Sequence, residues 1–223
     1  AMKAGALYPG FDRRGGISAE MDFTLGRTDE GRARQTMFAA LARVQQLPGV
    51  RAAAITTMLP YGNLTNGRRI MRLDEAAVAK TDPKAPEAGK GAIFTAVTPG
   101  WFETIGVKLL RGRNFTQTEA ENKDTPPVAI IDEVMAQALF PKGDALGQHV
   151  RYTTPPSDGS PNDMTIVGIV SKHSHEVLGD DMPRRPFVRL AQASNGGDSR
   201  PVRLTREDTA TATARRTAVT QTL

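Results

Sequence analysis

The chain has 223 residues, enough for one large domain or two small domains with a buried core. It contains no cysteine, which excludes disulfides, thiolate metal sites and a cysteine nucleophile. The formal net charge is +5, which we expect to reflect a solvated basic surface or proximity to an anionic membrane. We expect no nucleic-acid binding, because the arginines are scattered and only three tyrosines are available to stack on bases.

The first part of the chain predicts a strand–helix–strand unit. Residues 17–25 alternate in part between apolar and polar side chains, as a half-buried strand does. A helix is expected to start at residues 28–29 and to stop at the Pro-Gly pair of residues 48–49. Residues 50–59 are apolar and fit a covered strand. The apolar residues on one face of the helix are Ala33, Met37, Leu41, Val44 and Leu47.

Residues 97–115 are the most informative segment of the chain. A turn of residues 98–100 opens one helical turn, and Gly106 closes it, because a left-handed cap needs a residue without a Cβ. A short strand of residues 107–110 follows, and residues 111–113 turn the chain again. No residue here is an obvious nucleophile, base or metal ligand. The apolar residues expected in the core are Trp101, Phe102, Ile105, Val107, Leu109 and Leu110.

The rest of the chain predicts short strands separated by polar turns. Further short strands are expected at residues 69–73, 93–97 and 202–205. Surface loops are expected at residues 79–91, 116–127, 153–163 and 194–199.

Seven segments, taken in this order, resemble the extracytoplasmic core domain of MacB-type, FtsX-like ABC transporter permeases. Each segment is common by itself, and the specificity lies in their order over residues 17–223. They are LPGV (47–50), MLP (58–60), VTPGWFETIGVKLLRGRNF (97–115), VAIIDEVMAQALF (128–140), PKGDALGQHV (141–150), TIVGIV (165–170) and PFVRLAQ (186–192).

The resemblance implies a strand followed by a helix at residues 128–140, a turn at residues 141–150, and strands at residues 165–170 and 186–192. It also implies an α+β fold with two parts. A ferredoxin-like porter subdomain would comprise residues 1–59 and 185–223, and a smaller α/β sabre-like subdomain, residues 60–184, would be inserted into it. Residues 207–223 would form a helix, although their alternation of threonine with alanine supports a helix poorly. The porter strand that closes this fold would lie beyond Leu223.

The resemblance also implies a function. The domain would belong to a permease of the cell inner membrane, lie in the periplasm, and couple cytoplasmic ATP hydrolysis to export or to movement of a periplasmic substrate or partner. Its partners would be a second permease domain, a separate ATP-binding subunit acting through the membrane part, and a periplasmic adaptor. The alternative is a periplasmic ligand- or peptide-binding sensor module, which a deep apolar pocket between the two subdomains would favour.

The chain reads as an excised domain. No apolar run approaches the roughly 18 residues that a membrane helix needs, and no signal-peptide pattern opens the sequence. Ala1 and Met2 resemble the residue of an expression tag. We expect a monomer in dilute solution, because no long apolar patch is visible to hold a dimer.

The chain contains three histidines, His149, His173 and His175, and the last two are the candidate metal ligands. The last two stand at i and i+2, so they would share one face of a strand, and zinc or another transition metal uses such side chains. Two exposed histidines at a strand end explain the pattern better, so we expect no metal and no other cofactor. The nearby carboxylates are Glu176, Asp180 and Asp181.

Carboxylate pairs occur only in polar segments: Asp74 with Glu75, Glu119 with Glu121, and Asp180 with Asp181. General acid catalysis needs burial to raise a carboxyl pKa, and nothing in these segments predicts burial. Lys90 stands between two glycines, but the spacing and the Ser/Thr of a phosphate loop are missing. We therefore expect neither a catalytic site nor an ATP site, and no enzyme activity.

Three further side chains have two interpretations each. Arg111 and Arg113 would either bind an anion or a partner's carboxylate, or lie in a turn with the apolar part of each side chain packed over neighbouring residues. We prefer the second interpretation. Trp101 would be a buried anchor, which we prefer, or an exposed interface residue. The chain would cross between the two parts near residues 60–62 and 182–186, and these turn-prone sites predict hinges between two rigid bodies. The alternative to the hinges is one fused body with a shared core.

Overall fold

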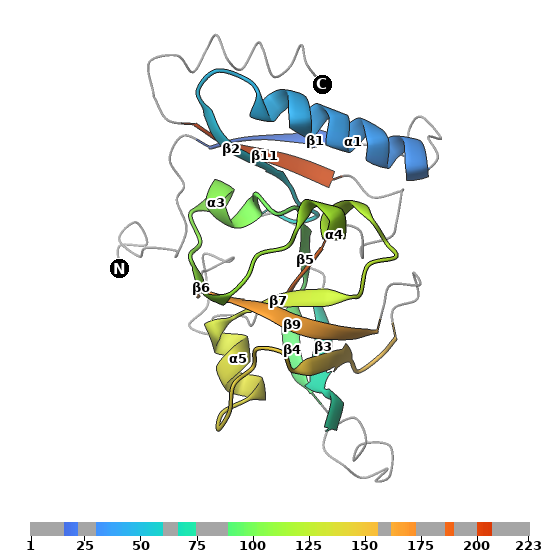
Figure 1. Ribbon diagram of the computed structural model, residues 1–223, viewed down its shortest axis with the longest axis vertical. Helices are drawn as coiled ribbons and strands as arrows, with labels where there is room; N and C mark the ends of the chain where they lie inside the picture. The colour runs from blue at the N-terminus through green and yellow to red at the C-terminus, as the bar shows by residue number, and fades with distance from the viewer. Residues whose placement is uncertain are drawn as a thin grey trace, which may run out of the picture.

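The computed structural model describes seven parts of the chain: residues 16–21, 30–59, 67–74, 89–155, 162–172, 186–189 and 200–206. Within these residues the strands form a three-stranded sheet and an eight-stranded sheet, which we call the small sheet and the large sheet. Figure 1 shows helix α1 along the small sheet at one end of the molecule and α5 beside the large sheet at the other end, with α3 and α4 between them. The predicted α+β class is confirmed.

The small sheet is antiparallel, with the order β1 (Gly16–Met21), β11 (Arg200–Arg206), β2 (Val50–Ile55). Helix α1 (Glu30–Gln45) packs against β2. Four of its five predicted face residues, Ala33, Met37, Leu41 and Val44, are buried, and Leu47 is half-buried after the helix end. The sequence pattern therefore predicted the order of this unit and the buried helix face correctly, whereas β2 ends at Ile55, four residues before the predicted limit of residue 59.

The large sheet is mixed, with the order β4-β3-β8-β9-β7-β10-β5, and β6 pairs with β9 outside this path. Strand β9 runs parallel to β7, and β10 runs parallel to β5, while the other pairs are antiparallel. The bounds are β3 (Gly67–Arg72), β4 (Lys90–Ile93), β5 (Thr95–Val97), β6 (Leu109–Gly112), β7 (Val128–Asp132), β8 (His149–Tyr152), β9 (Asp163–Val170) and β10 (Pro186–Arg189).

Three short helices each come after a strand of the large sheet along the chain: α3 (Trp101–Ile105) after β5, α4 (Gln117–Glu121) after β6 and α5 (Glu133–Leu139) after β7. Gly106 ends α3 in the left-handed conformation, as predicted, with φ of 70°. Helix α5 follows β7 directly because the Asp132 carboxylate accepts a hydrogen bond from the backbone N–H of Met135 at 2.7 Å. Helix α4 lies in a segment where the sequence analysis expected only a loop.

One hydrophobic cluster runs through both sheets. It joins Leu41 of α1 and Ile55 of β2 to Ile70, Phe94 and Ile131 of the large sheet. This cluster crosses the predicted limit between residues 59 and 60, so the two parts share a core. Strand β10 pairs with β5 and β7 and so belongs to the large sheet. This pairing favours a chain that passes from the large sheet back to the small sheet after residue 189, rather than at the predicted residue 185. The division into two subdomains stays a prediction.

The prediction that Leu109 and Leu110 lie in the core is wrong. Their side chains are 41% and 47% exposed. Strand β6 pairs only with β9 among the described strands, and a bulge between Leu109 and Arg111 interrupts the pairing. An edge strand of this kind has no second neighbour to cover its side chains.

Two glycines with the same backbone angle provide a test of packing. Gly112 and Gly147 both have φ of 76°, but an added Cβ at Gly112 would overlap the carbonyl oxygen of Val167, while Gly147 has no atom within 4 Å of that position. We expect Gly147→Ala to lose about 1 kcal/mol of unfolding free energy, from backbone strain alone. Gly112→Ala should lose about 2 kcal/mol more, because β9 must also shift. Urea unfolding of both variants measures the difference, and equal losses would contradict the packing argument.

Candidate functional site

The two sheets are joined by direct hydrogen bonds, at a contact that we call the seam (residues 53–58 and 95–101). The backbone N–H of Thr57 donates to the carbonyl oxygen of Ala96 at 3.0 Å, and the N–H of Ala96 donates to Thr57 Oγ1 at 3.0 Å. Thr56 and Val97 form an antiparallel bridge next to these bonds. The end of β2 therefore continues into the edge of the large sheet.

Thr98 closes the seam around Ile55. The backbone N–H of Thr98 donates to the Ile55 carbonyl oxygen at 3.0 Å, and the N–H of Ile55 donates to Thr98 Oγ1 at 2.9 Å. Thr98 is 1% exposed and Ile55 is fully buried, so water cannot replace these bonds. A buried backbone group without a partner costs free energy, and Thr98 therefore fixes the position of β2 against β5.

Helix α3 packs on β2 at the same place. A Cβ added to Gly100 would lie 2.8 Å from the carbonyl oxygen of Ala53, so only glycine allows this approach. Trp101 is 1% exposed and packs in a cluster with Ala54, Phe102 and Phe187. The preferred interpretation of Trp101 as a buried anchor is confirmed. Its indole Nε1 has no hydrogen-bond partner among the residues that the structure describes.

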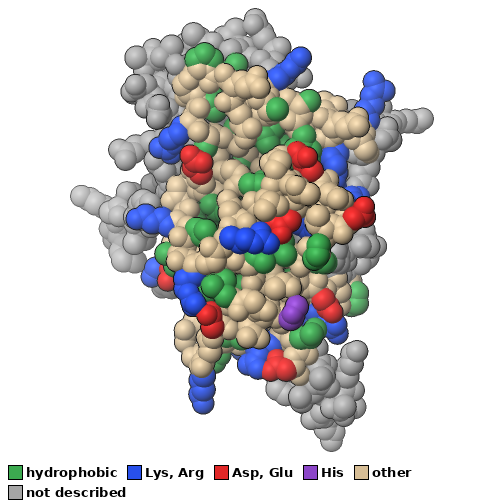
Figure 2. Space-filling model, viewed as in Figure 1, with side chains coloured by type: hydrophobic (Ala, Val, Ile, Leu, Met, Phe, Trp, Pro, Cys, Tyr) green, Lys and Arg blue, Asp and Glu red, His purple; other side chains and the backbone are tan. Residues whose placement is uncertain are grey.

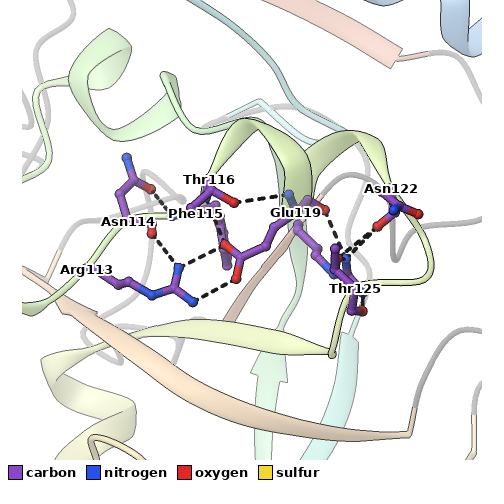
Figure 3. Close-up of polar contacts among 8 residues, drawn as sticks. Arg113, Asn114, Phe115, Thr116, Glu119, Asn122 and Thr125 are labelled. Carbon is purple, nitrogen blue, oxygen red and sulfur yellow. Dashed lines mark hydrogen bonds and ion pairs between the residues drawn. The ribbon is translucent and has the colours of Figure 1, made fainter.

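A second polar cluster holds helix α4 (Figure 3). The Arg113 guanidinium donates to both carboxylate oxygens of Glu119, at 2.7 and 2.9 Å. Thr116 and Glu119 form a capping box, in which each side chain bonds the other residue's backbone N–H. The hydrogen bond from Arg113 holds the pKa of Glu119 below its ordinary value, and the same pair raises the pKa of Arg113. A general acid would need the opposite shift.

Arg189 anchors the loop after α4 to β10. Its side chain is buried, and its guanidinium donates to the carbonyl oxygens of Glu119 at 3.1 Å and Asn122 at 2.7 Å. It also donates to the carbonyl and hydroxyl oxygens of Thr125. Burial lowers the pKa of Arg189, and the charge of Glu119 opposes this effect. The sequence analysis missed this residue, because the carbonyls that it binds are about 65 residues away in the chain.

The remaining candidates do not come together in one site. Lys90 starts β4 and is exposed, and Asp74 bonds to Arg72. Arg111 binds the Asp144 carboxylate at 3.0 Å, so both candidate arginines bind carboxylates of their own chain. His149 Nδ1 lies 3.3 Å from Thr165 Oγ1. Outside the described residues lie His173, His175, Glu75, Glu176, Asp180 and Asp181, as do the predicted crossings at 60–62 and 182–185 and the C-terminal helix.

The described residues contain no group of three or more His, Cys, Asp or Glu side chains placed to hold a metal ion. Among the helices that the structure describes, none has the length and apolar character that a membrane crossing demands.

The fold of the described residues is that of a permease periplasmic domain. The periplasmic region of MacB from Actinobacillus actinomycetemcomitans superposes with a TM-score of 0.60 at 14% identity, over 99% of this chain and 87% of that chain. A domain of a protein described as a permease, from Porphyromonas gingivalis, superposes with a TM-score of 0.52 at 16% identity, over 81% of this chain and 72% of that chain. No curated protein sequence matches this chain.

Residues 12–221 match the sequence profile of the MacB-like periplasmic core domain. The chain therefore belongs to the MacB-like periplasmic core domain family, as the order of its sequence segments predicted. The family is that of the periplasmic domain of MacB/FtsX-like ABC transporter permeases.

Thr98 and Thr104 provide a matched test of the seam. Both threonines are buried, but the Thr104 hydroxyl donates to the Gly100 carbonyl, which already accepts the N–H of Thr104. We expect Thr98→Val to lose about 1–3 kcal/mol of unfolding free energy, since it leaves the Ile55 N–H buried without an acceptor. Thr104→Val should lose less than about 1 kcal/mol. Chemical denaturation measures both values, and equal losses would show that Thr98 does not hold the seam.

The ion pair at α4 predicts an acid-sensitive contribution to stability. Because the folded state lowers the pKa of Glu119, ionised Glu119 stabilises the fold above its unfolded pKa of about 4.3, and this contribution is lost as pH falls through the folded pKa. Wild type should thus be more stable than Glu119→Gln at pH 7, and the two should converge in acid. Glu121→Gln removes the same charge outside the ion pair, and an identical pH dependence in that variant would contradict the assignment. Thermal unfolding from pH 7 to pH 3 measures the effect.

Proposed function

We propose that this domain transmits motion between the membrane part of an ABC transporter permease and a periplasmic substrate or partner. The single observation that carries the proposal, together with family membership, is the seam. It gives the small sheet a direct hydrogen-bonded path into the large sheet through Thr98, Thr57 and Ala96. A movement of the small sheet would therefore be passed to the large sheet through these hydrogen bonds, because no flexible linker lies between the bonded residues to absorb it.

The order of the strands supports the direction of this path. The small sheet contains β1 and β11, the first and last described strands of the chain. If membrane helices flank the domain on both sides, their movement reaches these two strands first. Strand β2 lies next to β11 and carries the seam, so it links the moving strands to the large sheet.

The seam favours motion of the domain as one body. The predicted hinges at residues 60–62 and 182–186 would let the two parts rotate separately. Such a rotation would break the bonds of Thr98 to Ile55 and divide the shared cluster of Leu41, Ile55 and Phe94. Both costs favour the fused-body alternative, and the hinge stays a prediction to be tested.

The proposal includes the partners and the location of the domain. ATP would be hydrolysed in the cytoplasm by a separate subunit, and the domain would pair in the periplasm with a second permease domain. A periplasmic adaptor would receive the motion. The domain itself would catalyse no reaction. The sensor alternative has less support, because the described seam residues Ile55, Thr56 and Val97 are buried against one another rather than lining a pocket.

Spin-label distances in the full-length transporter test the proposal. The domain has no cysteine, so Ala42→Cys on α1 and Gln137→Cys on α5, both exposed, give selective labels. The distance between the Ala42→Cys labels of the two paired domains should change when ATP stays bound to the ATP-binding subunit. The distance should return to its starting value when ADP is bound instead. The distance from Ala42→Cys to Gln137→Cys within one domain should stay constant, because the seam holds the two sheets together.

Each distance rejects a different part of the proposal. An unchanged distance between the two copies would mean that the domain does not follow the nucleotide state, and transmission would be wrong. A changed distance within one domain would mean that the sheets move separately, and the hinge would replace the single body. A variant of the ATP-binding subunit that binds but does not hydrolyse ATP is the control for trapping.

A further inference from the structure

An open groove lies in the large sheet, away from the seam. It is formed by the end of β3, the turn that follows α5 and the start of β8, and its volume is about 550 Å³. These elements lie at the end of the molecule opposite the small sheet in Figure 1. The volume lies in the range of ligand sites, roughly 300–1,000 Å³. Its apolar lining comes from Leu73, Phe140 and Pro141, and Leu73 is 39% exposed.

The carboxylates of the groove are already bound by arginines. Arg72 donates to the Asp74 carboxylate at 2.8 Å and lies over the Phe140 ring, 5.4 Å from its centroid. Arg111 binds the Asp144 carboxylate, whose pKa this hydrogen bond lowers. The groove therefore offers no unpaired carboxylate among its described residues.

Three hydrogen-bond donors that line the groove differ from its carboxylates, because they are available to a ligand. The side chains of Lys142 and Gln148 are exposed and make no hydrogen bond or ion pair within the part of the chain that the structure describes. His149 uses Nδ1 toward Thr165, which leaves its Nε2 for another group. An ammonium, an amide and an imidazole thus face one groove whose carboxylates are occupied. A ligand with a carboxylate fits this charge pattern, because it supplies the missing acceptor.

The apolar lining and the open shape limit the kind of ligand. A free anion would contact Lys142 but would leave Leu73 and Phe140 exposed. A lipid chain needs an enclosed apolar site, whereas this groove is open and has charged side chains along its rim. An extended peptide uses both features, because its alternate side chains present a carboxylate to the donors and apolar groups to the lining.

We propose that this groove binds an extended segment of a partner protein in which a glutamate or aspartate lies two residues from an apolar residue, because alternate side chains of an extended chain point to the same side. Lys142 would pair with the acidic side chain, Gln148 and His149 would donate to the peptide, and Leu73 and Phe140 would pack against its apolar residues. The groove shares no residue with the seam, so the proposal does not depend on transmission of motion. On the face shown in Figure 2, charges of both signs are interspersed, so a general attraction for acidic molecules would not account for selective binding.

Selection from a phage-displayed library of random linear peptides tests the proposal with the intact domain. The wild type should enrich peptides in which Asp or Glu lies two residues from an apolar residue. One enriched peptide, fluorescently labelled, should bind Lys142→Glu roughly tenfold or more weakly, since the new charge repels its carboxylate. Gln148→Ala should bind a few-fold more weakly. The glutamine analogue of the peptide should bind wild type more weakly than the acidic peptide does, but more tightly than the acidic peptide binds Lys142→Glu, because it loses the attraction to Lys142 without gaining a repulsion.

Lys90→Glu is the matched control, because Lys90 is equally exposed but lies on β4, outside the groove. Unchanged binding by this variant supports the proposal, and equal losses in Lys90→Glu and Lys142→Glu would overturn it. The absence of acidic enrichment would also overturn it. Two further results would overturn it by showing that the groove binds something else. One is a dimer of this domain in light scattering that Lys142→Glu abolishes. The other is sedimentation of the domain with phosphatidylglycerol vesicles that Lys142→Glu abolishes.

Discussion

The position of the two sheets depends on one threonine. Thr98 accepts from the N–H of Ile55 and donates its own N–H to the Ile55 carbonyl, at a place where both residues are buried. On its other edge β2 pairs with β11, so without Thr98 its last polar groups would face an apolar core. The close approach of Gly100 to β2 and the burial of Trp101 follow from this geometry, since both residues stand within three positions of Thr98 in the chain.

Local patterns predicted the elements well and the tertiary environment poorly. The face of α1 and the left-handed cap at Gly106 were predicted from the sequence, because helical periodicity and a closing glycine are signals that act over a few residues. The Asp132 carboxylate that caps α5 is a local signal of the same kind, but the sequence analysis did not use it. Helix α4 was missed although Thr116 and Glu119 have the spacing of a capping box, which was the available signal. The exposure of Leu110 depends on which strand lies at the sheet edge, and no short pattern encodes that.

The candidate site was the hardest part to predict. Thr98 was read only as a turn residue, and the partner of Arg189 was invisible, because both depend on contacts between distant segments. The same limit applies to family assignment. The MacB structure shares the fold at 14% identity, so the order of turns and strands is retained while most side chains differ. This explains why an ordered set of weak segments identified the family when each one alone did not.

Arg189 has a consequence for how freely the surface near it can vary. Its planar guanidinium meets main-chain oxygens of Glu119, Asn122 and Thr125, which every residue type supplies. Most of the bonds from Arg189 thus hold the loop by its backbone, the Thr125 hydroxyl is the side-chain acceptor among them, and the exposed Asp124 carboxylate accepts none of them. Relatives can therefore exchange the side chain at Asp124 and present a different surface on an unchanged loop. A lysine in place of Arg189 would lack the fork that reaches several carbonyls at once, so divergence should be fast on the loop and slow at its anchor.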